Sequence, residues 1–196
     1  MLRLFFILLL STLTLWAGRC QKYIQLERVA HYAVFGVDYP YWYGIGQLQQ
    51  ESGCRDIISR DGVGSQGVAQ ITYRVWQKFL NKKGIKNLYS VGNQIHAQAY
   101  IMQNCKKQAY SSHLWVAYSV YNSGHIVNKE ITKARKALHI REVPYSVAKK
   151  FCKRRMIHFN NGQVISACKI GYDYPKKVFK YGQEYKEFNT TSYRFW

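Results

Sequence analysis

Acidic residues are scarce in this chain of 196 residues, which carries 10 Asp and Glu against 29 Lys and Arg and a formal net charge of +19. A surface this basic attracts polyanions over long range. Nucleic acid is the usual polyanion, but the chain contains no recognised nucleic-acid-binding motif, so nucleic acid is not an expected partner. Anionic wall polymers and membrane surfaces are the expected partners instead.

Long apolar runs are also absent. The longest, residues 4–16 (LFFILLLSTLTLW), is shorter than a comfortable membrane span and follows a single positive charge at Arg3. Residues 1–17 are therefore predicted to be a secretory signal cleaved after Ala17, with an uncleaved N-terminal anchor as the alternative. The expected location is the periplasm or the cell envelope.

The five cysteines form no Cys-x-x-Cys pair and no Cys/His cluster, so the sequence predicts neither a metal site nor a cofactor. In an exported protein they can form disulfides, and an odd count leaves one over. Cys152 and Cys168 flank a basic Asn-Gly segment typical of a hairpin, which predicts a bond between them. Cys54 with Cys105 would tie a central loop to a neighbouring helix and leave Cys20 free. Buried free thiols are the alternative.

Apolar spacing, glycine stops and cationic helix ends predict a mainly helical chain. No internal repeat or low-complexity linker interrupts it. The predicted helices cover residues 24–34, 45–52, 75–82, 95–110, 114–121 and 127–138.

Glu51 is the candidate catalytic residue. Ile45 and Leu48 lie at helical spacing before it and Gly53 is a probable helix stop, so the carboxyl falls in the last helical turn. The negative end of the helix dipole and apolar packing both raise the pKa of a carboxyl placed there. A carboxyl that stays protonated can act as a general acid, as cleavage of a glycosidic bond requires. A surface glutamate at a frayed helix end is the alternative.

Three motifs decide between these interpretations: Glu51 with Ser52, residues 64–71 (GSQGVAQI) and residues 121–124 (YNSG). In order and spacing they resemble the motifs of soluble lytic transglycosylase (SLT) domains, whose fold goose-type lysozymes share. The resemblance covers about residues 41–150. It implies a mainly α, lysozyme-like domain over residues 21–150 that cleaves the β-1,4 bond between N-acetylmuramic acid and N-acetylglucosamine in peptidoglycan.

The resemblance also implies roles for particular residues. Glu51 would be the single catalytic acid and base, Asp61 a possible second acid that positions water, and Glu142 a supporting group behind the site. An exposed, salt-bridging glutamate is the alternative for Glu142. Ala69 replaces a methionine that the family usually has, and Thr72 occupies the position of a second goose-type aspartate. The residues expected to bind substrate are Ser59, Gln70, Ile71, Tyr121 and Asn122. A core aromatic residue with a satisfied hydroxyl is the alternative for Tyr121.

Residues 151–196 lie beyond the resemblance and are rich in basic and aromatic residues. Alternation such as that of residues 176–181 (KKVFKY) predicts strands, with Gly171 and Gly182 as turns. We expect a C-terminal extension that binds glycan strands, anionic wall polymers or lipid headgroups. A solvated basic extension that covers the catalytic domain is the alternative.

Three functions follow from these patterns. The first is a lytic transglycosylase that leaves 1,6-anhydro-muramyl ends, because only Asp56 and Asp61 lie near Glu51 and an intramolecular attack needs no second carboxylate. The second is a hydrolytic, goose-type-like lysozyme that uses Glu51 and Asp61. The third is a cationic wall- or membrane-binding protein on an inactive lysozyme-like scaffold. Wall remodelling, a secretion assembly and a phage assembly are all compatible contexts.

Overall fold

The computed structural model describes residues 18–59, 64–109, 111–140, 142–144, 146–147, 156–158, 162–188 and 191–196. The chain is mainly helical, which confirms that part of the predicted fold class. Its elements are α2 (Ile24–Phe35), α3 (Trp42–Ser52), α4 (Tyr73–Asn81), α5 (Val91–Gln108), α6 (Leu114–Ser123), α7 (His125–Leu138), β1 (Met156–His158), β2 (Val164–Ser166) and α9 (Ala167–Gln183). None of the helices among these residues has the length and apolar character needed to cross a membrane.

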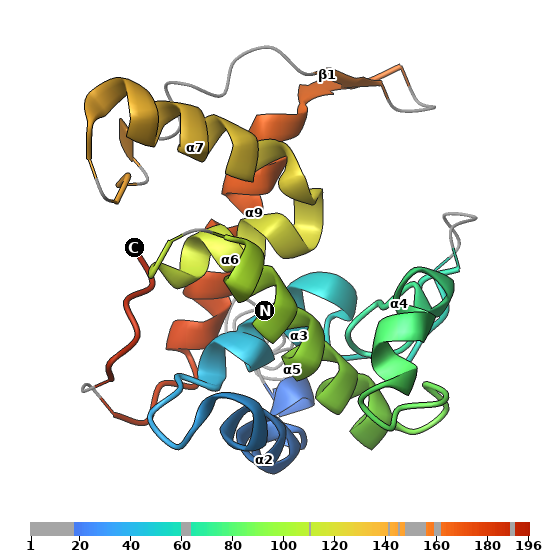
Figure 1. Ribbon diagram of the computed structural model, residues 1–196. Coiled ribbons are helices and arrows are strands. Elements are labelled where there is room, and N and C mark those ends of the chain that lie inside the picture. The colour runs from blue at the N-terminus through green and yellow to red at the C-terminus, as the bar shows by residue number, and fades with distance from the viewer. Residues whose placement is uncertain are drawn as a thin grey trace, which may run out of the picture.

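Helix α3 forms the centre of the core. Its residues 42 to 48 are all buried. It packs mainly against α9 and also against α2 (Figure 1), and Gln98 of α5 donates a hydrogen bond to its Gly44 carbonyl (3.1 Å). Figure 1 also shows that α7 and the strands stand above this group, with α9 running from them down into it. A helix that is buried on all sides has no polar face, so its sequence shows only a weak helical periodicity of apolar residues.

The predicted helix ends are largely confirmed, because they depend on local chemistry. Gly53 ends α3 with a φ of 60°, and Gly124 ends α6 with a φ of 63°. Both angles lie in the left-handed region, which glycine adopts without steric cost. Helix α5 begins earlier than predicted, because the Ser90 side chain accepts a hydrogen bond from the Asn93 N–H and caps it (3.1 Å).

The strands predicted between residues 172 and 196 are wrong, because residues 167–183 form helix α9. Its buried positions recur mostly every three or four residues, a helical period that outweighs the short alternation at residues 176–181. These positions are Cys168, Gly171, Tyr172, Tyr174, Pro175, Val178 and Gly182.

Pro175 lies inside α9, where its missing N–H leaves the carbonyl of Gly171 without its usual helical partner. The buried hydroxyl of Ser119, on α6, donates a hydrogen bond to this carbonyl. A side chain of the neighbouring helix thus satisfies the backbone group that proline frees, and α9 continues through the position.

Helices α3 and α9 approach each other closely at two glycines. A Cβ on Gly46 would lie 2.3 Å from the carbonyl oxygen of Val178, and one on Gly182 would lie 3.0 Å from the carbonyl oxygen of Trp42. Such distances leave no room for any side chain. This approach sets α9 firmly against the helix that carries Glu51.

The C-terminal residues complete the same core. The N–H groups of Leu114 and Trp115, at the start of α6, donate to the carbonyls of Arg194 and Phe195 (2.8 and 2.9 Å). These donors have no partner within their own helix, so the C-terminal segment caps α6. Phe195 is itself buried. Residues of the predicted extension 151–196 therefore belong to the core that surrounds α3.

Strands β1 and β2 pair antiparallel, with Met156 opposite Ser166 and His158 opposite Val164, which agrees with the predicted hairpin. Cys168 lies in the first turn of α9 and is disulfide-bonded. Cys152, its predicted partner, lies outside the described residues.

Candidate active site

Glu51 occupies the last turn of α3, as predicted, and is only partly exposed. Burial raises the pKa of its carboxyl to about 7, while a hydrogen bond from Tyr174 acts in the opposite direction. Because this pKa lies close to neutral pH, both the acid and the carboxylate are populated there. One side chain can therefore donate a proton and then accept one.

Tyr174 is the functional residue that sequence reasoning missed. Its hydroxyl donates a hydrogen bond to Oε1 of Glu51 from helix α9, 123 residues further along the chain. Burial raises the pKa of Tyr174 well above its usual value, so the hydroxyl stays protonated and remains a donor. The helical spacing of the buried residues of α9 is the signal that could have placed this tyrosine on the inner face.

Tyr121, expected to bind substrate, stacks on Tyr174 with ring centroids 6.5 Å apart and planes 13° from parallel. Its hydroxyl donates to the carbonyl of Ala69 (3.2 Å). Burial and the nearby charge of Glu51 raise its pKa well above the usual value. Tyr121 thus forms a wall beside the carboxyl and holds the loop of residues 64–71, with its hydroxyl directed at the backbone.

Ser52, the second residue of the first motif, joins the end of α3 to that loop. Its buried hydroxyl donates to the carbonyl of Val68 (2.8 Å) and accepts from the N–H of Arg55 (3.0 Å). The amide of Gln94 holds the same loop, accepting from the Val68 N–H (2.8 Å) and donating to Asp56 (3.0 Å). These bonds fix the end of α3 and the loop of residues 64–71 relative to each other.

Gly67 is required by this arrangement. Its φ is 79°, and a Cβ there would lie 2.2 Å from the side-chain carbon of Gln94. The glycine in the second motif therefore lets the loop lie directly on α5.

Three other predicted substrate-binding residues make their described contacts within the loop or the core: Gln70, Ile71 and Ser59. Gln70 donates its side-chain amide to the carbonyls of Gly67 and Ile57 (2.7 and 3.0 Å), so it braces its own loop. Ile71 is buried in the core. The N–H of Ser59 donates to the Ser65 carbonyl (2.8 Å) within the same loop.

Neither of the two carboxyls expected to assist Glu51 makes a described contact with it. Asp61 lies outside the described residues. Glu142 accepts hydrogen bonds from Ser112 and His113, just before the start of α6, and these bonds lower its pKa. Asn122 lies at the other end of α6, about 12 Å further along the helix.

The predicted disulfide between Cys54 and Cys105 is wrong. Cys54 bonds to Cys20, whose Cα lies 5.2 Å away, within the usual range for a disulfide. Cys105 is a free thiol buried on α5, and burial raises its pKa to about 12. The bond ties the loop three residues beyond Glu51 to the segment that precedes α2, a proximity that sequence spacing does not reveal.

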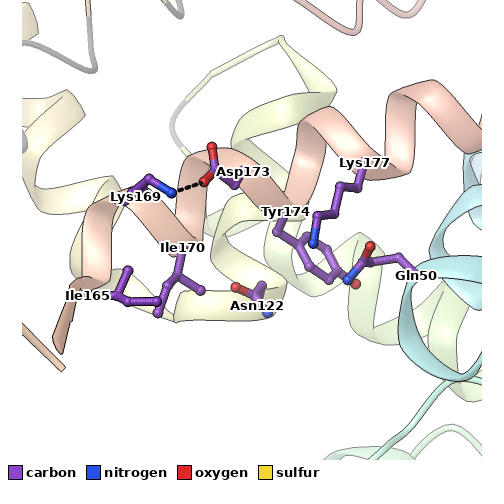
Figure 2. Close-up of a pocket in the computed structure, with 8 residues that line it drawn as sticks. All are labelled: Gln50, Asn122, Ile165, Lys169, Ile170, Asp173, Tyr174 and Lys177. Atoms are coloured by element: carbon purple, nitrogen blue, oxygen red, sulfur yellow. Dashed lines mark hydrogen bonds and ion pairs between the residues drawn. The ribbon is translucent and has the colours of Figure 1, made fainter. Parts of the chain in front are cut away.

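A pocket of about 280 Å³ lies beside Tyr174. Asn122 lines it, as does Gln50, the neighbour of Glu51. Figure 2 shows these two amides and Lys177 around the Tyr174 ring, with further α9 residues along one wall. The lining residues are Gln50, Asn122, Ile165, Lys169, Ile170, Asp173, Tyr174 and Lys177. Of the predicted substrate-binding residues, Asn122 is thus the one that lines this open space.

Comparison of the chain with protein-family models, curated proteins and solved structures gave no match in any of the three. Within the described part of the chain, no group of three or more His, Cys, Asp or Glu side chains is placed to hold a metal ion.

Proposed function

We propose that this chain is an exported lytic transglycosylase with a lysozyme-like catalytic domain, which cleaves the β-1,4 bond between N-acetylmuramic acid and N-acetylglucosamine in peptidoglycan. The observation that carries the proposal is the state of Glu51: a carboxyl at a helix end, with a pKa of about 7, held by the hydroxyl of Tyr174 and adjoining a pocket. The resemblance of its motifs to those of SLT domains supplies the substrate.

Among the described residues, the carboxyls of Asp56, Asp173 and Glu27 are engaged elsewhere in the fold, which favours the intramolecular route; Asp61 lies outside those residues. Asp56 accepts a hydrogen bond from Gln94 (3.0 Å), and Asp173 pairs with Lys169 (3.0 Å). Glu27 is buried in the core against His31 (2.8 Å). A single carboxyl suffices when the attacking group belongs to the substrate, because no water must be activated from the opposite face.

In the proposed reaction, protonated Glu51 donates its proton to the glycosidic oxygen as the bond to the muramic anomeric carbon breaks. The hydroxyl of Tyr174 stabilises the carboxylate that forms. The 6-hydroxyl of the same muramic sugar then attacks the anomeric carbon and gives its proton to Glu51. The acid is thereby restored, and the product carries a 1,6-anhydro ring.

Charge and disulfide chemistry support export to an anionic surface. The formal net charge of +19 favours association with wall polymers, and the Cys20–Cys54 bond suits an oxidising compartment.

Replacing Glu51 by Gln tests the proposal. The amide keeps the size of the side chain but cannot donate the proton, so turnover of purified peptidoglycan should fall below about a tenth of the wild-type rate, with the fold retained. Circular dichroism checks folding, and mass spectrometry of the wild-type digest should show 1,6-anhydro-muramyl ends. Reducing ends that carry solvent oxygen would indicate hydrolysis. Wall binding without turnover by the wild type would indicate a binding protein.

A further inference from the structure

The pocket beside Tyr174 has an unequal charge distribution. Lys169 and Lys176 both pair with Asp173, at 3.0 and 3.8 Å, which offsets the only carboxylate among the lining residues. No described carboxylate forms an ion pair with Lys177. Among the residues that the structure describes, Lys177 is thus the lysine of this pocket without an ion-pair partner.

The same pocket combines this cation with apolar and amide groups. Ile165 and Ile170 line one part of it, whereas Lys177 lies with Gln50 near the Tyr174 ring (Figure 2). An occupant that suits this lining carries a carboxylate, a few methyl groups and amide groups. A short peptide with a free carboxylate has this composition, and an uncharged sugar lacks the anionic part.

The position of the pocket, next to Glu51, indicates where such a peptide would come from. Gln50 and Tyr174 join the pocket directly to Glu51. In peptidoglycan a short peptide stem, which bears free carboxylates, is attached through the lactyl group of the muramic sugar. The first residues of that stem must lie close to the group that protonates the neighbouring glycosidic bond.

We propose that this pocket binds the peptide stem of peptidoglycan, with Lys177 pairing with a stem carboxylate and Ile165 and Ile170 contacting its methyl groups. The inference rests on the proposed function, because it names a part of the substrate for the same site. It makes the enzyme selective for strands that carry stems.

Turnover of two substrates tests this inference: glycan strands with stems, and the same strands stripped by an amidase, with the lactyl carboxylate that the amidase frees then capped as an uncharged methylamide. Lys177→Gln should lower kcat/KM on stem-bearing strands about five- to tenfold, the net scale of one hydrogen bond at an exposed lysine, and leave stripped strands unaffected. Lys177→Arg should recover most of the loss. Lys180→Gln, which removes an exposed lysine of the same helix outside the pocket, is the matched control.

A binding measurement separates this inference from the proposed function. In the Glu51→Gln background, titration calorimetry with a muramyl peptide that ends in a free glutamate carboxylate should show binding that Lys177→Gln weakens about five- to tenfold. If the wild type turns over neither substrate but this binding persists, the proposed function fails and the pocket assignment stands. Equal loss on both substrates, or no effect of Lys177→Gln on turnover and binding, would overturn the assignment.

Discussion

At the scale of single residues, the chemistry depends on how two opposing effects set the pKa of Glu51. Burial disfavours the carboxylate, whereas the Tyr174 hydroxyl stabilises it, and the pKa settles at about 7 because burial is the larger effect. Activity that needs the protonated acid should therefore fall as the pH rises through about 7.

Tyr174→Phe should move this alkaline limb of the pH profile to higher pH, because it removes the interaction that lowers the pKa of Glu51. The plateau of kcat/KM should fall about tenfold, since the carboxylate that forms during the reaction loses one hydrogen bond. A pH–rate profile measures both effects. Tyr121→Phe is the control: its hydroxyl bonds to Ala69 and its removal should leave the limb in place. A Tyr174→Phe limb that stays at the wild-type position would contradict the assignment.

At the scale of elements, α9 is held in register by contacts that short side chains make possible. Gly46 and Gly182 allow close approach to α3, and Ser119 satisfies the carbonyl of Gly171 that Pro175 leaves free. These contacts set the position of Tyr174. The same residues therefore stabilise the packing and determine the geometry of the site.

Ser119→Ala should lower the free energy of unfolding by about 1–3 kcal/mol, because it leaves a buried carbonyl without a partner. Urea denaturation measures the loss. Ser123→Ala, whose hydroxyl bonds to the carbonyl of Ser119 on the same helix (2.7 Å), should cost less, since Ser123 is partly exposed and that carbonyl keeps its helical bond from the N–H four residues on.

A double variant tests the cause. In a Pro175→Ala background the new N–H can bond to the Gly171 carbonyl, so Ser119→Ala should cost less there than in the wild type. Equal losses in both backgrounds would show that the serine does not act through this carbonyl.

At the scale of the whole molecule, residues of the C-terminal quarter belong to the same core as α3. Tyr172, Tyr174, Val178 and Phe195 are buried in the same cluster as Trp42. The basic residues around them still contribute to the charge of +19, so one segment both adds positive charge and completes the core.

Truncation after Lys150 should therefore abolish cooperative unfolding, because it exposes large apolar surfaces of α3 and α6 and removes Tyr174. Thermal melting followed by circular dichroism measures this. A chain that lacks only residues 1–17 is the control and should melt cooperatively. A truncated chain that melts cooperatively and still cleaves peptidoglycan would instead show that residues 151–196 form a separate appendage.

The sequence by itself determined what local chemistry controls. Gly53 and Gly124 end helices because only glycine enters the left-handed region freely, and the turn that carries Glu51 follows from the spacing before Gly53. The raised pKa of Glu51 also follows from the placement of a carboxyl in a buried last turn. Each of these features depends on neighbours a few residues apart.

Only the tertiary structure decided which distant groups meet. Tyr174 lies 123 residues from Glu51 in the sequence and donates a hydrogen bond to it. Cys54 forms its disulfide with Cys20 and not with Cys105, because the folding of the chain, and not sequence spacing, brings two cysteines within bonding distance. The helical state of α9 was likewise decided by packing: its apolar residues permit either period over a short stretch, and burial against α3 and α6 selects the helix.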